Sequence, residues 1–185
     1  MHLQPIKTLA ILLCAALFCN VSAHTKTDDL PEVDLHAPYV ATPYPVVEAM
    51  LTLARVGPSD LLIDMGCGDG RIAIQAAKRY GAHAIGVDIN PQRVAEAKEN
   101  AKRAGVEHLV RFEERNVYDT DVSRATVVAM YLLQNMQIKL RPALQSQLSP
   151  GARIVSHTFD MGDWKPTRTK SVGGDHVFLW ELPGK

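Results

Sequence analysis

The chain has 185 residues, which is enough for one domain with a substantial core and makes a second domain unexpected. Lys plus Arg and Asp plus Glu both number 20, so the formal charge is zero and no overall field favours nucleic acid or an anionic membrane. Since no basic run overrides this balance, nucleic acid is excluded as an expected partner.

The first 23 residues have the layout of a secretory signal peptide. Lys7 precedes an apolar stretch from Leu9 to Phe18, and Val-Ser-Ala at 21–23 forms an A-x-A-like cleavage site before His24. The apolar stretch is short for a bilayer span of about 20 residues, so cleavage is favoured over permanent anchoring. We therefore expect an exported or periplasmic protein, with stable membrane contact only if the leader is retained.

Residues 24–38 mix acids and prolines with few apolar side chains, which indicates a linker or surface-hugging arm before a domain at 39–185. The domain opens with a predicted helix, because Thr42 can cap a first turn and Pro43 suits that turn. The buried stripe of this helix would comprise Val46, Val47, Met50, Leu51 and Ala54.

The stretch from Leu61 to Arg71, LLIDMGCGDGR, is the most informative in the chain. Its first three residues suit a strand that is buried on both faces, as in a parallel sheet. Gly66, Gly68 and Gly70 permit backbone angles closed to residues with a Cβ, and they let a ligand approach the main chain. The apolar spacing that follows predicts a helix, so the stretch indicates half of a Rossmann-like, nucleotide-cofactor unit.

A second predicted strand, Ala84 to Val87, ends at Asp88, 18 residues past Gly70, where this fold places an acid for ribose hydroxyls. The pattern D-x-G-x-G-x-G is not the dinucleotide G-x-G-x-x-G, and it lacks the Gly-Lys-Ser/Thr of a phosphate loop. Asp64 and Asp69 put negative charge where a pyrophosphate would sit. The turn therefore favours a ligand that carries an amine and a sulfonium over one that carries phosphates.

Cysteine usage indicates no disulfide in the mature chain. Cys14 and Cys19 lie in the leader, which leaves Cys67 alone. Cys67 is predicted to be a small packing residue of the glycine turn rather than a reactive thiol.

The remaining elements continue the alternation of strand and helix. Asn90 can cap a helix with Pro91 at its first position, and Gly105 ends that helix. The next strands are predicted at 109–112, 126–133 and 153–158, with two short helices at 136–140 and 142–148 that Pro142 separates. Two final strands, 167–172 and 176–182, meet at a glycine-rich hairpin turn. The predicted fold class is α/β: a single, doubly wound Rossmann-like domain with a seven-stranded mixed sheet and a C-terminal antiparallel hairpin.

Ligands in such sheets bind beyond the carboxyl ends of the strands. Asn116-Val117 follows the third strand, and the Asn116 carbonyl can accept a hydrogen bond there. Tyr131, near the end of the fourth strand, is predicted to orient an incoming amine, with a core tyrosine as the alternative. His157 is predicted to be structural rather than a base, and no cysteine pair or histidine cluster indicates a metal.

The DMGCGDGR run resembles the first motif of class I S-adenosylmethionine-dependent methyltransferases, which makes S-adenosylmethionine the expected cofactor. That resemblance implies that Asp88 accepts the ribose hydroxyls, that Asp64 holds the methionine amine and that Asn116 contacts adenine, where the class usually has an acid. The expected cofactor-binding residues are Tyr39, Thr42, Asp64, Gly66, Cys67, Gly68, Asp88, Ile89, Asn116 and Val117.

Four stretches resemble a narrower family, the protein-lysine methyltransferases that include mitochondrial enzymes acting on the adenine nucleotide translocase and the ATP synthase c-subunit, and archaeal relatives. These stretches are Tyr39-Val-Ala-Thr-Pro43 with the helix after it, DMGCGDGRI, Gly86-Val-Asp-Ile-Asn-Pro91, and GARIVSHTFDMGDWKP at 151–166. The family's cofactor contacts map onto Tyr39, Thr42, Asp64, Gly66, Gly68 and Asp88. Ala41 stands where the family usually has Pro, and Asn116 where it has Asp.

The resemblance implies methyl transfer to an accessible lysine of a protein substrate, by an enzyme expected to be a monomer. Two alternatives stay open: methylation of a small molecule or lipid, and a cofactor-binding protein that transfers no methyl group. The export-type leader conflicts with a cofactor that is made in the cytoplasm, whereas the intact Asp64, glycines and Asp88 argue for an active site.

Overall fold

The computed structural model describes residues 39–184, so the predicted leader and arm lie outside the described residues. The strands are β1 (Leu61–Met65), β2 (His83–Asp88), β3 (Val110–Glu114), β4 (Val127–Met130), β5 (Arg153–His157), β6 (Arg168–Val172) and β7 (Asp175–Glu181). The helices are α1 (Tyr44–Leu53), α2 (Arg71–Tyr80), α3 (Pro91–Ala104) and α4 (Gln134–Gln147), with a 3-10 turn, η1, at Val117–Asp119.

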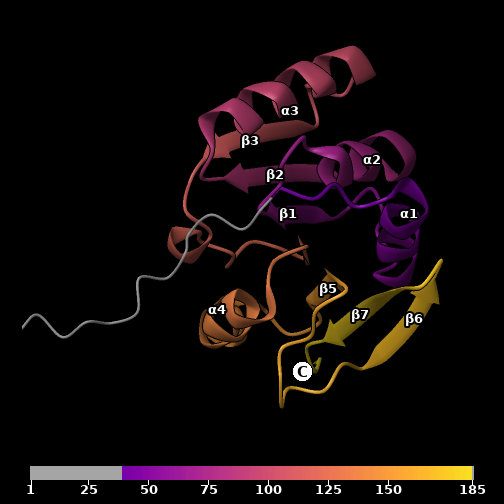
Figure 1. Ribbon diagram of the computed structural model, residues 1–185, viewed down its shortest axis with the longest axis vertical. Helices are drawn as coiled ribbons and strands as arrows, with labels where there is room; N and C mark the ends of the chain where they lie inside the picture. Colours follow the sequence, from indigo (N-terminus) through magenta and orange to yellow (C-terminus); the bar gives the residue numbers. More distant parts are fainter. Residues whose placement is uncertain (1–38, 185) are drawn as a thin grey trace, which may run out of the picture. The chain divides into compact units, whose positions relative to one another are not determined.

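The seven strands form one sheet in the order β3-β2-β1-β4-β5-β7-β6 (Figure 1). The first five strands of the chain pair in parallel, and β7 runs antiparallel to both β5 and β6. Gly173 and Gly174 connect β6 to β7 with φ values of 61° and 95°. Two-residue hairpin turns need such positive φ values, which glycine adopts without strain. The predicted α/β class, the mixed sheet and the C-terminal hairpin are confirmed.

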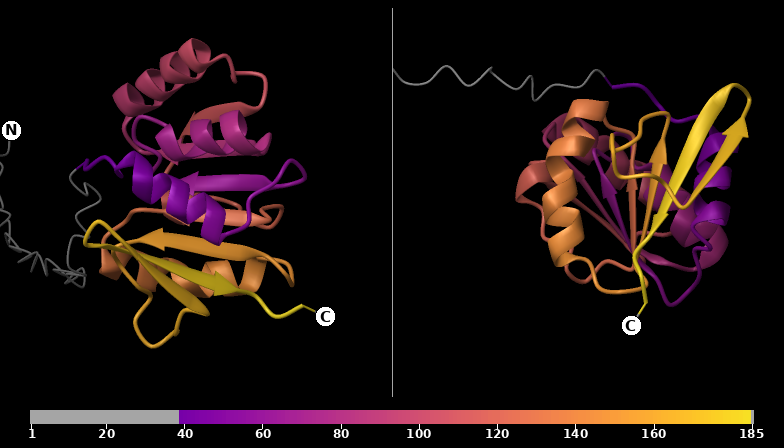
Figure 2. Two further views of the ribbon diagram at one scale, coloured as in Figure 1. Left: turned by 90° about the vertical axis from the view of Figure 1, so that its right-hand side faces the viewer. Right: turned by 90° about the horizontal axis from the view of Figure 1, so that it is seen from below.

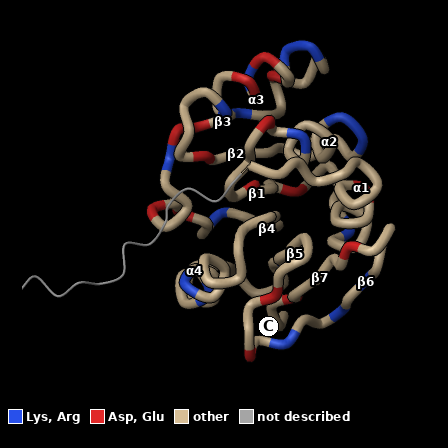
Figure 3. Tube along the Cα trace, viewed as in Figure 1, with Lys and Arg blue, Asp and Glu red and all other residues tan. Residues whose placement is uncertain are grey.

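Helices cover the two faces of the sheet unequally. Buried residues of α1, α2 and α3 pack on one face of the sheet and form one core layer with it. On the other face, α4 and η1 pack against strand residues such as Met130 and Trp180, and Leu140 of α4 lies in this second layer. Figure 2 shows the sheet between α4 on one side and α1 and α2 on the other. Basic residues gather at the carboxyl ends of α2 and α3, where they complement the helix dipoles (Figure 3). Within residues 39–184, no helix is long and apolar enough to cross a bilayer.

The prediction of two short helices separated by Pro142 is wrong, because the single helix α4 runs through this proline without a break. Pro142 removes the hydrogen bond to the carbonyl of Ile138, but both residues are exposed, so water can satisfy that carbonyl. Leu140 and Leu144 are buried on the opposite side of the helix and hold it on the sheet. Packing therefore outweighs the local cost of the proline.

The capping role predicted for Thr42 is also wrong. The N-cap of α1 is Pro43, and no side chain caps this helix. The side chain of Thr42 instead lies 3.2 Å from Nδ1 of His157, at the end of β5. Asn90 does cap α3, through hydrogen bonds that its side chain accepts from the backbone N–H groups of Gln92 and Arg93.

A buried ion pair lies at the amino ends of the strands. Asp60 pairs with Arg153, and it also accepts hydrogen bonds from Thr126 Oγ1 at 2.7 Å and from the Gly57 N–H at 2.8 Å. We expect Asp60→Ala to lower the free energy of unfolding by about 3–5 kcal/mol, because it leaves the buried guanidinium of Arg153 without a counter-charge. Urea unfolding measures this loss.

The matched control for this prediction is Asp163→Ala. Asp163 also pairs with an arginine, but its side chain is 85% exposed, so solvent screens the pair and we expect a much smaller loss than in Asp60→Ala. A similar loss in both variants would show that the pair at Asp60 is no stronger than a surface pair.

Candidate functional site

The glycine turn between β1 and α2 bends the chain sharply at the carboxyl end of β1. Gly66, Gly68 and Gly70 have φ values of 76°, 53° and 80°, in the left-handed region that favours glycine. The backbone N–H groups of Gly66 and Cys67 both donate to the Val87 carbonyl at 2.9 Å, so the turn is fixed to the end of β2.

The same glycines are surrounded by side chains that leave no room for a Cβ. A Cβ on Gly68 would lie 2.4 Å from the ring of Tyr39, and one on Gly66 would lie 2.7 Å from Leu132. Leu132 follows β4, while Tyr39 precedes α1. The turn is therefore where segments from three parts of the chain meet.

Asp64 is the most unusual residue of the site. It lies on β1 with 1% of its surface exposed, and neither carboxyl oxygen has a hydrogen-bond partner among the described residues. Burial raises the pKa of Asp64 to about 8, the Ala73 backbone N–H opposes this shift, and the nearby charges of Asp88 and Asp69 act with it. The Ala73 N–H lies outside hydrogen-bond geometry, so neither carboxyl oxygen is satisfied by it. A buried acid without partners is costly unless a ligand supplies them, so Asp64 marks a place for a cationic hydrogen-bond donor.

Asp88, at the end of β2, has a structural role that the sequence did not reveal. Its Oδ2 accepts a hydrogen bond from the Gly68 N–H at 2.9 Å, and its Oδ1 accepts one from the Asn90 N–H at 2.9 Å. Each carboxylate oxygen has a further lone pair, so two ligand hydroxyls can still be accepted. Asp88 therefore holds the glycine turn and keeps acceptor capacity for a ligand.

The segment from Tyr39 to Thr42 lies against the glycine turn. The Arg93 guanidinium lies 3.8 Å from the centre of the Tyr39 ring, and Thr42 is buried. Arg71, which no sequence pattern indicated, donates to the Thr42 carbonyl at 3.0 Å and pairs with Asp69 at 2.6 Å. Burial alone would raise the pKa of Asp69, but the hydrogen bonds and the charge of Arg71 lower it.

On the β3 side of the turn, the residues predicted to contact adenine differ in exposure and in hydrogen bonding. Ile89 is 37% exposed, whereas Val117 is buried in η1. The Asn116 side-chain carbonyl oxygen already accepts a hydrogen bond from the Tyr118 N–H at 3.0 Å, so it is less free for a ligand than the sequence suggested. Within residues 39–184, the Nδ2 group of Asn116 makes no such hydrogen bond and can donate to a ligand.

Cys67 is buried, and this burial raises the pKa of its thiol far above the ordinary range. The thiol is therefore protonated and unreactive at neutral pH, in line with the predicted packing role. In the part of the chain that the structure describes, no group of three or more His, Cys, Asp or Glu side chains is arranged to hold a metal ion.

Tyr131 is the first residue after β4, because this strand is shorter than predicted. Its ring centre lies 4.0 Å from that of His157 and 6.3 Å from that of Phe159. Burial lowers the pKa of His157, against the opposing charge of Asp175, so the imidazole is neutral at pH 7. The carboxyl ends of β4 and β5 thus present an uncharged aromatic surface next to the turn.

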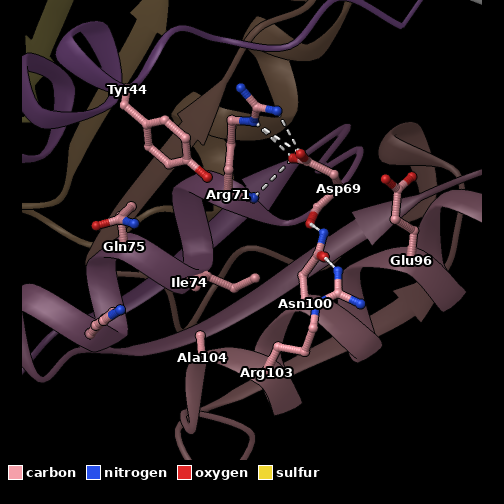
Figure 4. A pocket seen from close by; sticks show the side chains of 10 residues that line it. Tyr44, Asp69, Arg71, Ile74, Gln75, Glu96, Asn100, Arg103 and Ala104 are labelled. Carbon is pink, nitrogen blue, oxygen red and sulfur yellow. Dashed lines mark hydrogen bonds and ion pairs between the residues drawn. The ribbon is translucent and has the colours of Figure 1, made fainter.

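A separate cleft of about 360 Å³ lies between α2 and α3 (Figure 4). Its polar lining is largely satisfied internally, since Arg71 pairs with Asp69 and Asn100 donates to the Asp69 carbonyl. None of the residues predicted to bind the cofactor lines this cleft. The unsatisfied acid of the described domain lies instead at the end of β1.

A parallel sheet of this strand order, closed by an antiparallel β7 and carrying acids on β1 and at the end of β2, defines the class I methyltransferase fold. The chain belongs to the ANTKMT methyltransferase domain family, whose model matches residues 64–168.

Relatives and solved structures agree with this family. A protein-lysine N-methyltransferase of Saccharolobus islandicus (strain REY15A) is 46% identical over 138 residues, which are 74% of this chain and 86% of that protein. The adenine nucleotide translocase lysine N-methyltransferase of Mus musculus is 31% identical over 81% of this chain, which spans 65% of the mouse protein. The crystal structure of an RNA methyltransferase from Salinibacter ruber in complex with S-adenosyl-L-homocysteine has 51% identity and a TM-score of 0.77, and the match covers 79% of this chain and 95% of that one.

Proposed function

We propose that this protein is an S-adenosylmethionine-dependent protein-lysine N-methyltransferase. The observation that carries the proposal is Asp64, a buried carboxyl without partners at the glycine turn of a methyltransferase fold. The amine of S-adenosylmethionine is a cationic donor of the kind that this acid lacks. The similar protein from Salinibacter ruber, which was crystallised with S-adenosyl-L-homocysteine, the demethylated product of this cofactor, supports the choice of ligand.

The other predicted contacts are distributed around Asp64 in a way that suits this cofactor. Asp88 would accept the ribose hydroxyls, and Ile89, Asn116 and Val117 would flank the adenine. Gly66 and Gly68 would let the ligand approach the main chain, with Cys67 packed behind them. Tyr39 and Thr42 would close the site from the segment before α1.

When bound, S-adenosylmethionine would supply the methyl group of its sulfonium to a neutral amine nitrogen, with a C–N bond formed, the C–S bond broken and a thioether as the leaving group. The acceptor lysine must first lose a proton to solvent, which costs about 4 kcal/mol at pH 7.4 for a pKa near 10.4. His157 is a poor base for this proton because burial lowers its pKa. The chain would instead contribute alignment of the amine with the methyl group, with Tyr131 orienting it.

Lysine is the favoured acceptor because the archaeal and mouse relatives are both named as lysine methyltransferases. The Salinibacter ruber protein is named as an RNA methyltransferase instead. The zero formal charge of this chain favours protein over RNA, since phosphate binding draws on clustered cations. A small-molecule or lipid acceptor is the remaining alternative.

For the first 38 residues, the proposal rests on the sequence alone. We propose that residues 1–23 are cleaved after export and that residues 39–185 act as a monomeric catalytic domain. Sequencing the amino terminus of protein purified from cells checks the first point, because an intact Met1 would contradict cleavage.

The cofactor assignment predicts that Asp88→Ala weakens the affinity for S-adenosylhomocysteine about tenfold to a hundredfold. The physical reason is the loss of two hydrogen bonds to a charged acceptor, together with looser support of the Gly68 N–H. Isothermal titration calorimetry measures the change, and Asp163→Ala serves as the control because that acid is 85% exposed and remote from the turn in sequence. Equal affinities of wild type and Asp88→Ala would contradict the assignment.

The acceptor is identified by incubating the protein with labelled S-adenosylmethionine and fractionated cell extract. We expect label on lysine side chains of proteins, which peptide mass spectrometry locates. Label confined to the RNA fraction or to the organic-soluble fraction would reject the lysine proposal while leaving the methyltransferase intact.

A further inference from the structure

Three rings lie together where β4 and β5 end. The Tyr131 ring is tilted by 42° against His157 and lies nearly parallel to Phe159, with an interplanar angle of 23°. Tyr131 and Phe159 are only partly buried, whereas His157 is almost fully buried behind them. We name Tyr131 and Phe159 the aromatic wall.

The aromatic wall adjoins the proposed cofactor site through two contacts. Leu132, next to Tyr131, fills the space beside Gly66 of the glycine turn. His157, which packs against Tyr131, lies 3.2 Å from the Thr42 hydroxyl. The wall is therefore adjacent to the turn and is not a separate surface cluster.

A strained turn places Phe159 against Tyr131. The Phe159 N–H donates to the His157 carbonyl at 2.8 Å, while Thr158 between them has a φ of 65°. This is a γ-turn of the rare hand, and a β-branched residue at positive φ is costly. Such strain persists where the surrounding structure enforces it, most often at ligand sites. In this case the fold holds the ring in one position.

One buried amide connects the two loops that carry the wall. Gln137 is fully buried, and its Nε2 donates to the Leu132 carbonyl and to Ser156 Oγ, both at 2.8 Å. Ser156 Oγ in turn donates to the Phe159 carbonyl at 2.8 Å. Because the wall is fixed in the unliganded protein, a ligand does not have to order it on binding.

An acid follows the wall directly in the chain. Asp160 follows Phe159, and its Oδ1 accepts hydrogen bonds from Gln134 Nε2 at 2.7 Å and from the Gly162 N–H at 2.9 Å. These two donors fix the carboxylate without neutralising it, since neither is charged. The nearby cation Arg141 is occupied by Asp163, so it does not compensate Asp160.

We propose that the aromatic wall and Asp160 form the binding site for the acceptor amine, and that they select a cationic alkylammonium group. Aromatic faces attract ammonium groups, and a carboxylate attracts the same charge while repelling phosphate. His157 behind the wall is neutral, so it does not oppose the cation. This inference rests on the proposed function and adds the residues, Phe159 and Asp160, that choose the acceptor.

The test uses the full chain with poly-L-lysine and, separately, bulk tRNA as acceptors for labelled S-adenosylmethionine. We expect transfer to poly-L-lysine, a KM for it that rises about tenfold in Phe159→Ala and about threefold in Asp160→Asn, and a smaller change in kcat. Phe159→Tyr should restore the KM to near the wild-type value. Anisotropy of fluorescein-labelled poly-L-lysine, measured with S-adenosylhomocysteine present, should show the same order of affinities without turnover.

Matched controls separate the wall from general damage. Phe178→Ala removes a partly buried ring on β7, and Glu107→Gln removes an exposed charge after α3, so both should leave the KM within about twofold. Calorimetry with S-adenosylhomocysteine should give wild-type affinity for every variant in this set.

The outcomes distinguish the two proposals. Transfer to poly-L-lysine with an unchanged KM in Phe159→Ala and Asp160→Asn would overturn the acceptor site and leave the lysine methyltransferase standing. Transfer to tRNA alone, or to neither acceptor and to no protein of a whole-cell extract, would overturn the lysine function and the acceptor site together.

Discussion

Asp64→Asn is expected to stabilise the unliganded protein at pH 8 while it abolishes measurable affinity for S-adenosylhomocysteine. Burial raises the pKa of Asp64 from 3.8 to about 8, so between these values the folded chain holds one proton more than the unfolded chain. The free energy of unfolding therefore falls by about 1.4 kcal/mol for each pH unit from about 4 towards 8, or up to about 4 kcal/mol by pH 7. Asparagine carries no charge, so the free energy of unfolding of the variant does not fall in this way as the pH rises.

Urea unfolding of both proteins from pH 5 to pH 8.5 measures the effect. The wild type should lose stability relative to Asp64→Asn as the pH rises, and the difference should level off above about pH 8, where the carboxyl is ionised in both states. A parallel pH dependence of the two proteins would contradict the raised pKa. Asp163→Asn, which removes an exposed acid, is the control for a general charge effect.

The same residue makes ligand binding depend on pH. The ionised carboxylate is the form that accepts hydrogen bonds from an amine, and it is the minor form in the unliganded protein below about pH 8. We expect the affinity for S-adenosylhomocysteine to rise about tenfold per pH unit between pH 6 and pH 8, with release of one proton on binding. Calorimetry in buffers of different ionisation enthalpy counts that proton.

Gly70→Ala is expected to lower the free energy of unfolding by about 3 kcal/mol or more. Gly70 has a φ of 80°, and a Cβ there would lie 2.6 Å from the Phe112 ring and 2.9 Å from the Cβ of Ala97. The left-handed backbone costs an alanine about 1–2 kcal/mol, and overpacking adds about 1–3 kcal/mol. Urea unfolding with a fixed m-value measures the sum.

Gly151→Ala separates the two causes. Gly151 has a φ of 86°, but nothing lies within 4 Å of the place for its Cβ. We expect this variant to lose only the backbone contribution, about 1–2 kcal/mol. If the two alanine variants were equally destabilised, the packing around Gly70 would be looser than the structure indicates.

Much of this fold follows from local sequence. The apolar runs at 61–63 and 84–87, the capping Asn90 and the terminating Gly105 each predicted an element that the structure confirms within a few residues. These signals succeed because they act over one or two turns of chain. Pro142 misled the prediction because burial of Leu140 and Leu144 on the sheet, a tertiary effect, keeps its helix intact.

The location of the site could be predicted from the sequence, but the contacts between its side chains could not. Asp64 and Asp88 each follow an apolar run, and this placement is enough to predict that they lie at one edge of a parallel sheet. The pairing of Arg71 with Asp69 and Thr42, and the approach of Phe159 to Tyr131, join segments far apart in the chain. No local pattern carries that information, so only the structure supplied them.

The connection from β5 to β6 has a consequence for how this protein can change over evolutionary time. The structure describes all of residues 158–167 and places no helix there. The segment that carries Phe159 and Asp160 also buries Met161 in the core, and its Trp164 carbonyl accepts a hydrogen bond from Trp180 Nε1 at 2.7 Å. Substitutions in this segment that change the substrate preference must therefore keep Met161 and Trp164 packed on the core. A new specificity can arise only if the domain remains stable.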